Sequence, residues 1–262
     1  MDESIERQRE HFNGISERYS RARKHPNHLL LKHLIWGKFL KLHRDIAPEI
    51  RRVLEPMCGM AEGEAMLRTH LTSQFDYFGF DYSESMVQQA RSCRPELSIE
   101  WNDVTTFRAG GEAFDLIILI GGLHHVYSHA EAVLSNLNRS LRPGGYFLSF
   151  EPTHHNWLAR RVRERIYNKN DLFDADTEQG FEYRDLERYF RNSGYEKVGE
   201  ASPGLLAYVL YYNPDAFPAL NVGSELLVKL IFGLDRLFWR NAVGRKLSFA
   251  TLGLWRKPDR PA

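Results

Sequence analysis

The fold is decided by residues 53–63, which read Val53-Leu54-Glu55-Pro56-Met57-Cys58-Gly59-Met60-Ala61-Glu62-Gly63. A short apolar strand runs here into a loop with glycines, and a helix is expected over 61–71. Glycine lets the backbone approach a ligand closely, and a helix N-terminus offers N–H groups that lack partners. The pattern is typical of a nucleotide-type site, although alone it also fits an ordinary turn between a strand and a helix.

The segments around this stretch alternate between strands and helices. The unbroken apolar run over 114–120 indicates a strand buried on both faces, as in a parallel sheet. Ser83 can cap the helix after the second strand, and Gly194 can end a later helix. The alternation predicts an α/β fold with a doubly wound, mostly parallel, seven-stranded sheet. The expected strands are at 53–54, 77–80, 97–101, 114–120, 146–150, 195–198 and 247–255.

Composition excludes several classes of protein. The 262 residues carry 35 Lys+Arg against 34 Asp+Glu, a net charge of +1, which argues against a dedicated nucleic-acid binder. Cys58 and Cys93 are the two cysteines, too few for a disulfide scaffold or a multi-cysteine zinc site. They fit a reducing, cytoplasmic location, and with no long apolar run we expect no membrane-spanning segment.

Two aspartates follow the next two expected strands. Asp81 ends the second strand, 22 residues after Gly59, where a carboxylate can accept hydrogen bonds from both hydroxyls of a ribose. Asp103 follows the third strand, where it can accept from an adenine amino group. These loops lie at the carboxyl ends of adjacent strands, which is where ligands bind in open α/β sheets.

With these residues in order, the chain resembles the class I S-adenosylmethionine-dependent methyltransferases. The resemblance covers roughly residues 50 to 151 and implies a Rossmann-like methyltransferase fold with S-adenosyl-L-methionine as cofactor. It is carried by residues 53–63, Gly79-Phe80-Asp81-Tyr82-Ser83-Glu84-Ser85-Met86, Asn102-Asp103-Val104, Phe114-Asp115-Leu116-Ile117 through Leu123-His124-His125-Val126, and Leu141-Arg142-Pro143-Gly144-Gly145.

The resemblance also implies roles for single residues. The loop over 55–59 would hold the methionine part of the cofactor, Asp81 the ribose, and Asp103 with the Val104 backbone the adenine. The loop at Gly121 would lie alongside the cofactor. The implied cofactor-binding set is Tyr19, Glu55, Gly59, Asp81, Tyr82, Met86, Asp103, Val104 and Gly121.

Two residues depart from the family pattern. Met57 and Ala61 stand where glycines are usual. Because Met57 does not easily take a positive φ, we expect the loop to differ locally. A dinucleotide-binding site is a rival interpretation, but the full G-x-G-x-x-G pattern is absent and Asp103 favours the methyltransferase set.

Histidines supply candidate bases for an acceptor that must lose a proton. His124 and His125 follow the fourth strand and come first, and His154 follows the fifth and comes second. His155 completes that pair, and Glu151 is a further candidate that could equally cap a helix or form a salt bridge. The histidines and the aspartates at 171–176 match no metal signature, so no metal is predicted.

Three parts of the chain are expected around this chemistry. A helical lid covers residues 1–48, in which Pro26 separates two helices and the first ten residues form a solvated, helix-prone arm. The cofactor-binding core takes 49–202 and 245–257, and an apolar helical insertion takes 203–244. The insertion carries a stripe that should be buried against the core, against another subunit or over the acceptor. That stripe consists of Leu226, Leu227, Leu230, Ile231, Leu234, Leu237 and Phe238.

The sequence therefore predicts methyl transfer to a small-molecule acceptor, and the apolar insertion favours a hydrophobic or lipid-like acceptor or a homodimer interface. Two alternatives stay open. One is a methyltransferase acting on a sugar or glycoconjugate. The other is an interaction protein that keeps the cofactor fold without catalysis. The intact Asp81 and Asp103 weigh against the latter.

Overall fold

The computed structural model describes residues 3–111, 113–155, 161, 180–214 and 219–259. Its described part is built on a sheet with strand order β3-β2-β1-β4-β5-β8-β7, and β6 pairs with β5 off this path. Neighbours from β3 to β5 run parallel, and β8 runs antiparallel between β5 and β7. The strands are β1 Arg52–Pro56, β2 Asp76–Asp81, β3 Ser98–Trp101, β4 Phe114–Ile120, β5 Leu141–His154, β6 Phe181–Glu182, β7 Glu196–Ala201 and β8 Ala250–Arg256.

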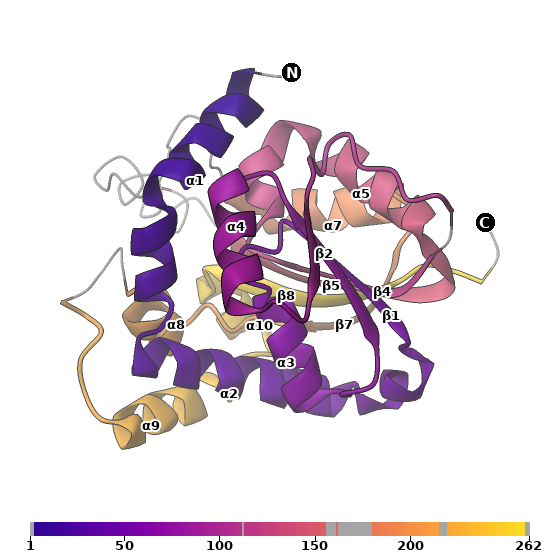
Figure 1. The fold of residues 1–262 in the computed structure, drawn as a ribbon. Helices are drawn as coiled ribbons and strands as arrows, with labels where there is room; N and C mark the ends of the chain where they lie inside the picture. The colour runs from indigo at the N-terminus through magenta and orange to yellow at the C-terminus, as the bar shows by residue number, and fades with distance from the viewer. Residues whose placement is uncertain (1–2, 112, 156–160, 162–179, 215–218, 260–262) are drawn as a thin grey trace.

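Helices cover both faces of this sheet (Figure 1). Side chains of α2, α3, α4 and α8 share one apolar core with the sheet, and those of α5 and α7 share the other. This confirms the predicted doubly wound α/β class with seven strands on the main path. The helices are α1 Glu3–Ala22, α2 Pro26–Leu42, α3 Glu62–His70, α4 Glu84–Cys93, α5 Ala130–Ser140, α7 Tyr183–Asn192, α8 Leu206–Tyr211, α9 Glu225–Asp235 and α10 Ala242–Leu247, with 3-10 turns η1 Arg44–Glu49 and η2 Leu123–His129.

Local signals in the sequence set several of these boundaries. The Ser83 hydroxyl accepts from the Met86 N–H at 3.2 Å and caps α4 as predicted. Pro26 opens α2, where its missing N–H costs nothing. Gly194 follows α7 with φ +84°, a conformation that glycine adopts freely.

Some predicted boundaries are wrong. The first ten residues are helical as predicted, since α1 begins at Glu3, but they are not a wholly solvated arm, because Gln8 is buried. The last strand begins at Ala250, since α10 extends to Leu247. β6 was not predicted, because a strand of two residues is too short to show a periodicity in the sequence.

The loop after β1 keeps left-handed backbone at three alternate residues. Met57 has φ +53°, Gly59 φ +49° and Ala61 φ +58°. The expectation that Met57 would force a different loop is therefore wrong. A side chain in this conformation costs about 1–2 kcal/mol, and the surrounding hydrogen bonds hold it there.

The apolar stripe of the 203–244 segment is exposed in this chain, so its predicted burial against the core is wrong. Leu226 is 76% exposed and Leu237 68%. α9 packs on α2 and α8 through a different face, which carries Val228 and Phe232. The predicted helix is present over Glu225–Asp235, but an arc of it other than the predicted stripe makes the contact with the core.

Loop strain can be measured on Ala61. Ala61→Gly should change the free energy of unfolding by no more than about 0.5 kcal/mol, because relief of the left-handed strain offsets the lost methyl burial and the greater freedom of the unfolded chain. Ala65→Gly in α3 lacks that relief and should lose about 1–2 kcal/mol. Urea unfolding of both variants tests this, and equal losses would show that residue 61 is unstrained.

Candidate functional site

Residues from four neighbouring strand ends and from α1 line one cavity. The side chains come from the loop after β1, the ends of β2 and β3, the turn after β4, and the N-terminal helix. The cavity volume is about 10 Å³, so the helix fills the space above the loops. The lining residues are Gln8, Met57, Tyr82, Asp103, Val104, His125 and Val126.

Asp81 ties the first two loops together. Its Oδ2 accepts from the Gly59 N–H at 2.9 Å, and its Oδ1 accepts from the Ser83 N–H at 3.0 Å. Burial raises the pKa of this carboxyl, and the hydrogen bonds from Ser83 and Gly59 oppose that rise. A carboxylate has about four lone-pair positions, so each oxygen can accept one further hydrogen bond.

Glu55 supports the same loop from the end of β1. Its carboxylate accepts from the N–H groups of Gly63 at 2.8 Å and Glu64 at 3.0 Å, and from the Tyr77 hydroxyl at 2.8 Å. A Cβ at position 63 would lie 2.7 Å from Glu55 Oε1, which explains the glycine there. These contacts give Glu55 a positioning role, and its direct contact with a cofactor stays a prediction.

Glu151 organises the turn after β4 from the neighbouring strand. Its Oε1 accepts from the N–H groups of Gly122 at 3.1 Å and Leu123 at 3.0 Å. Its Oε2 lies 3.0 Å from His124 Nδ1 and accepts from the His124 N–H at 3.3 Å. Burial raises the pKa of Glu151 to about 7, against the opposing effect of these contacts. The carboxylate therefore caps η2 and orients His124, which is itself buried.

His125 lies on the cavity side of the same turn. Its ring is 4.0 Å from that of His124 and 4.8 Å from that of Phe12, measured between centroids. Phe12 also meets the Tyr82 ring at 6.3 Å. Asn13 Oδ1 accepts from the Ser83 hydroxyl at 2.7 Å. α1 thus closes over both the second and the fourth loop.

The other predicted cofactor residues lie around the same loops. Met86 packs beside Gly59, since a Cβ on Gly59 would be 3.4 Å from Met86 Cε. Asp103 Oδ1 accepts from the Thr105 N–H at 2.8 Å. Gly121 has φ +61° and donates its N–H to Phe150 O at 2.7 Å. Tyr19 lies in α1, and its side chain is outside the described part of the structure.

The second histidine pair lies further along β5. His154 ends that strand beside Glu182 of β6, and the cavity lining includes His125 but not His154. The His155 ring stacks on Tyr183 at 4.5 Å, and burial with nearby positive charge lowers the pKa of His155 to about 4. Within the described residues no group of three or more His, Cys, Asp or Glu is arranged to hold a metal ion, and residues 171–176 lie outside that part.

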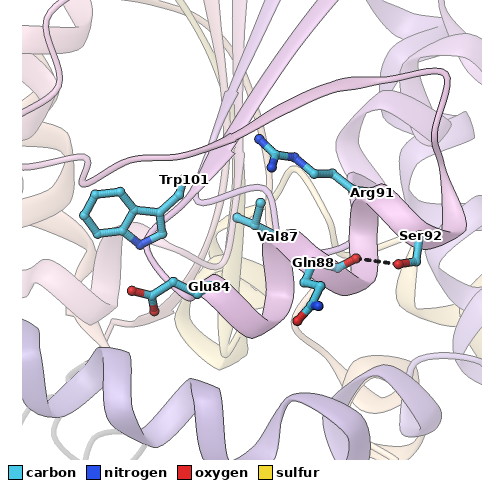
Figure 2. Close-up of a pocket in the computed structure, with 6 residues that line it drawn as sticks. All are labelled: Glu84, Val87, Gln88, Arg91, Ser92 and Trp101. Carbon is cyan, nitrogen blue, oxygen red and sulfur yellow. Dashed lines mark hydrogen bonds between the residues drawn. The ribbon is translucent and has the colours of Figure 1, made fainter.

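An open surface pocket of about 390 Å³ lies elsewhere, on α4 and β3 (Figure 2). Its side chains converge between Trp101 and Arg91, and the Ser92 hydroxyl donates to Gln88 O at 2.8 Å. None of the residues predicted to bind cofactor or move a proton lines it. We therefore place the chemistry at the strand ends.

Sequence reasoning missed the residues of α1 that enter the site, Gln8, Phe12 and Asn13. No motif marks them, because they reach the loops only through the packing of α1 on α4 and η2. Their one available signal was helical spacing, since residues 8 and 12 are one turn apart.

The residues present suit S-adenosylmethionine. Asp103 and Val104 line the cavity, and Asp81 binds the glycine loop. These carboxylates can accept hydrogen bonds from the ribose hydroxyls and the adenine amino group of an adenosine moiety. The cavity itself is far below the several hundred Å³ of usual ligand sites. With α1 in this position the cavity is therefore too small to hold the cofactor.

Comparison with known proteins gives consistent results. The family described as "Methyltransferase domain" matches residues 53–145. A trans-aconitate 2-methyltransferase of Variovorax paradoxus is 31% identical over 141 residues, covering 52% of this chain and 53% of that protein. A phthiotriol/phenolphthiotriol dimycocerosates methyltransferase of Mycobacterium tuberculosis is 30% identical over 176 residues, covering 61% and 64%.

The matched region thus spans only about half to two thirds of these relatives' lengths. Among solved structures, a SAM-dependent methyltransferase of Thermotoga maritima superposes with a TM-score of 0.63 at 17% identity, covering 95% of this chain and 99% of that one. At that identity the likeness shows the fold.

Asp81→Ala should weaken binding of S-adenosylhomocysteine by about 2–4 kcal/mol, because ligand hydroxyls and two loop N–H groups lose their acceptor. Asp76→Ala, an exposed change at the other end of β2, is the matched control and should bind normally. Titration calorimetry measures both, with circular dichroism as the check on folding. Unchanged affinity in folded Asp81→Ala would remove the ribose assignment.

Proposed function

We propose that this chain, which belongs to the class I S-adenosylmethionine-dependent methyltransferases, transfers a methyl group to a small-molecule acceptor. The observation that carries the proposal is the convergence of Asp103, Tyr82 and His125 on one cavity, next to the loops that Asp81 and Glu151 hold.

Asp81 would hold the ribose, Asp103 and Val104 the adenine, and the loop at Gly59 the methionine part of the cofactor. When bound, S-adenosylmethionine supplies an activated methyl group on a sulfonium. The chain must then bind the acceptor, orient it and remove its proton.

His124 is the residue best placed to remove that proton. Its Nδ1 lies 3.0 Å from Glu151 Oε2, so the carboxylate can hold a proton on Nδ1 and fix the tautomer in which Nε2 is the basic nitrogen. The carboxylate stabilises the imidazolium that results. His125, which lines the cavity and is in ring contact with His124, is the second candidate. His154 is the third, because it ends β5 beside Glu182 of β6. This assignment suits a hydroxyl or ammonium acceptor.

We further propose that the acceptor is hydrophobic or lipid-like. Support comes from the segment over 203–244, which carries exposed apolar side chains and packs on the core next to β5. There the Phe150 ring contacts Tyr208 at 6.2 Å and Tyr212 at 5.3 Å between centroids. One curated relative is named for phthiotriol and phenolphthiotriol dimycocerosates.

Residues 1–48 would act as the lid of this site, since α1 fills the space above the loops. Phe12→Ala removes the ring that packs on Tyr82 and His125, and should speed association of S-adenosylhomocysteine several-fold. Glu17→Ala, an exposed change on the same helix, should leave the rate unchanged. Stopped-flow fluorescence measures both, and equal rates in all three proteins would contradict a lid.

His124→Ala should lower turnover by about 10²–10⁴-fold with nearly constant cofactor affinity. His129→Ala, at the end of the same turn, is the matched control and should retain turnover. Turnover of the unsubstituted protein should rise with pH and level off above about pH 7, because the Glu151 carboxyl that orients His124 must be ionised and burial raises its pKa to about 7. His124→Ala should lose this rise.

The turnover assay needs an acceptor. Mass spectrometry of cell extracts with and without the protein can identify one, because its product is heavier by one methyl group. Wild-type turnover in His124→Ala would move the role of base to His125 or His154. Cofactor binding without turnover on any acceptor would favour the non-catalytic alternative.

A further inference from the structure

Apolar side chains are concentrated on one exposed surface of the C-terminal helices, which we call the α9 face. Leu226 is 76% exposed, Leu230 59% and Leu234 56%. Several large apolar side chains exposed along one helix mark an interaction site. The α9 face comprises the exposed apolar residues of α9 and of the turn after it, Leu226, Leu227, Leu230, Leu234, Leu237 and Phe238.

α9 has separate faces for packing and for this exposed surface. Val228 and Phe232 are buried against α2 and α8. At 100° per residue, Leu226, Leu230 and Leu234 form an adjoining arc within about 80° of one another. The helix therefore already has its tertiary contact, and the exposed leucines are additional to it.

Basic residues border the α9 face. Residues 225–247 contain Lys229, Arg236, Arg240, Arg245 and Lys246 against Glu225 and Asp235. Both acids are engaged, since Glu225 pairs with Lys229 and buried Asp235 accepts from the Ala207 N–H at 2.6 Å. Arg236 and Arg240 are exposed, whereas Arg245 of α10 lies 3.5 Å from Glu200 Oε1, so the positive charge beside the leucines comes mainly from Arg236 and Arg240.

The helix α9 itself lies at the edge of the molecule, where it projects beyond α2 and α8 (Figure 1). A flat partner can reach it there without meeting the sheet. Within the described residues, no helix has the length and apolar character to cross a bilayer. A helix with leucines on one arc and Lys or Arg beside them is instead suited to lie in the interface of a membrane.

We propose that the α9 face docks on the surface of a bilayer that contains anionic lipid. The leucines and Phe238 enter the boundary of the acyl chains, and the arginines meet the headgroup phosphates. Charge favours this partner over a second copy of the chain, because a symmetric dimer through this face brings like-charged rims together. The proposal goes beyond methyl transfer and would bring the site to a membrane-dissolved acceptor.

Flotation with vesicles of phosphatidylcholine and phosphatidylglycerol tests this on the full chain. Wild type should float with anionic vesicles, and at least tenfold less with phosphatidylcholine alone or in high salt. Leu230→Ser with Leu234→Ser should reduce binding about tenfold or more. Arg236→Glu with Arg240→Glu should do likewise. Arg188→Glu with Arg191→Glu, exposed on α7, is the charge control and should bind as wild type does.

Sedimentation velocity of the same proteins, with circular dichroism as the folding check, completes the experiment. A monomer that floats through the α9 face supports the proposal. Failure of wild type to bind anionic vesicles overturns it, as does a dimer that the leucine substitutions dissociate. The proposal would also be overturned if the α7 control lost as much vesicle binding as the Arg236→Glu with Arg240→Glu variant. These vesicles contain neither cofactor nor acceptor, so the result is separate from that of the methyltransferase assay.

Discussion

Buried backbone N–H groups at the carboxyl ends of the strands must find acceptors, and three buried carboxylates supply them. Glu55 binds the start of α3, Asp81 joins the loop after β1 to the start of α4, and Glu151 binds the turn after β4. An unpaired buried N–H costs about 1–3 kcal/mol, so each acid fixes one loop against its neighbour. The geometry of the candidate site depends on these contacts.

The three carboxylates that hold the loops also affect ligand binding and proton transfer at the site. Burial raises the pKa of all three, and of Glu55 and Glu151 to about 7, so their charged forms depend on the loop hydrogen bonds. Met57 and Ala61 have positive φ, which costs free energy. Part of the stabilisation from these hydrogen bonds offsets that cost. Asp81 keeps lone pairs for a ligand, and Glu151 orients His124. A change that loosens one loop should therefore alter both binding and proton transfer.

The sequence was informative where a short motif carries its own physics. The strand pattern, the Ser83 cap and the Gly194 stop follow from local chemistry, and they located the strand ends and the predicted cofactor loops. The partners of Glu55 and Glu151 did not follow, because they depend on which strands lie side by side. Helical periodicity revealed the leucines of α9 but not which arc packs, since Val228 and Phe232 are equally apolar. The contact of Phe12 with the site arises from tertiary packing alone.

The central claim is that the loops held by these acids bind the adenosyl cofactor once α1 moves aside. A crystal structure of the protein with S-adenosylhomocysteine tests it most directly. The account predicts the Asp81 carboxylate within hydrogen-bond distance of the ribose hydroxyls, Asp103 beside the adenine, and Phe12 displaced from Tyr82 and His125. A ligand bound elsewhere, or bound with Phe12 still packed on both rings, would contradict it.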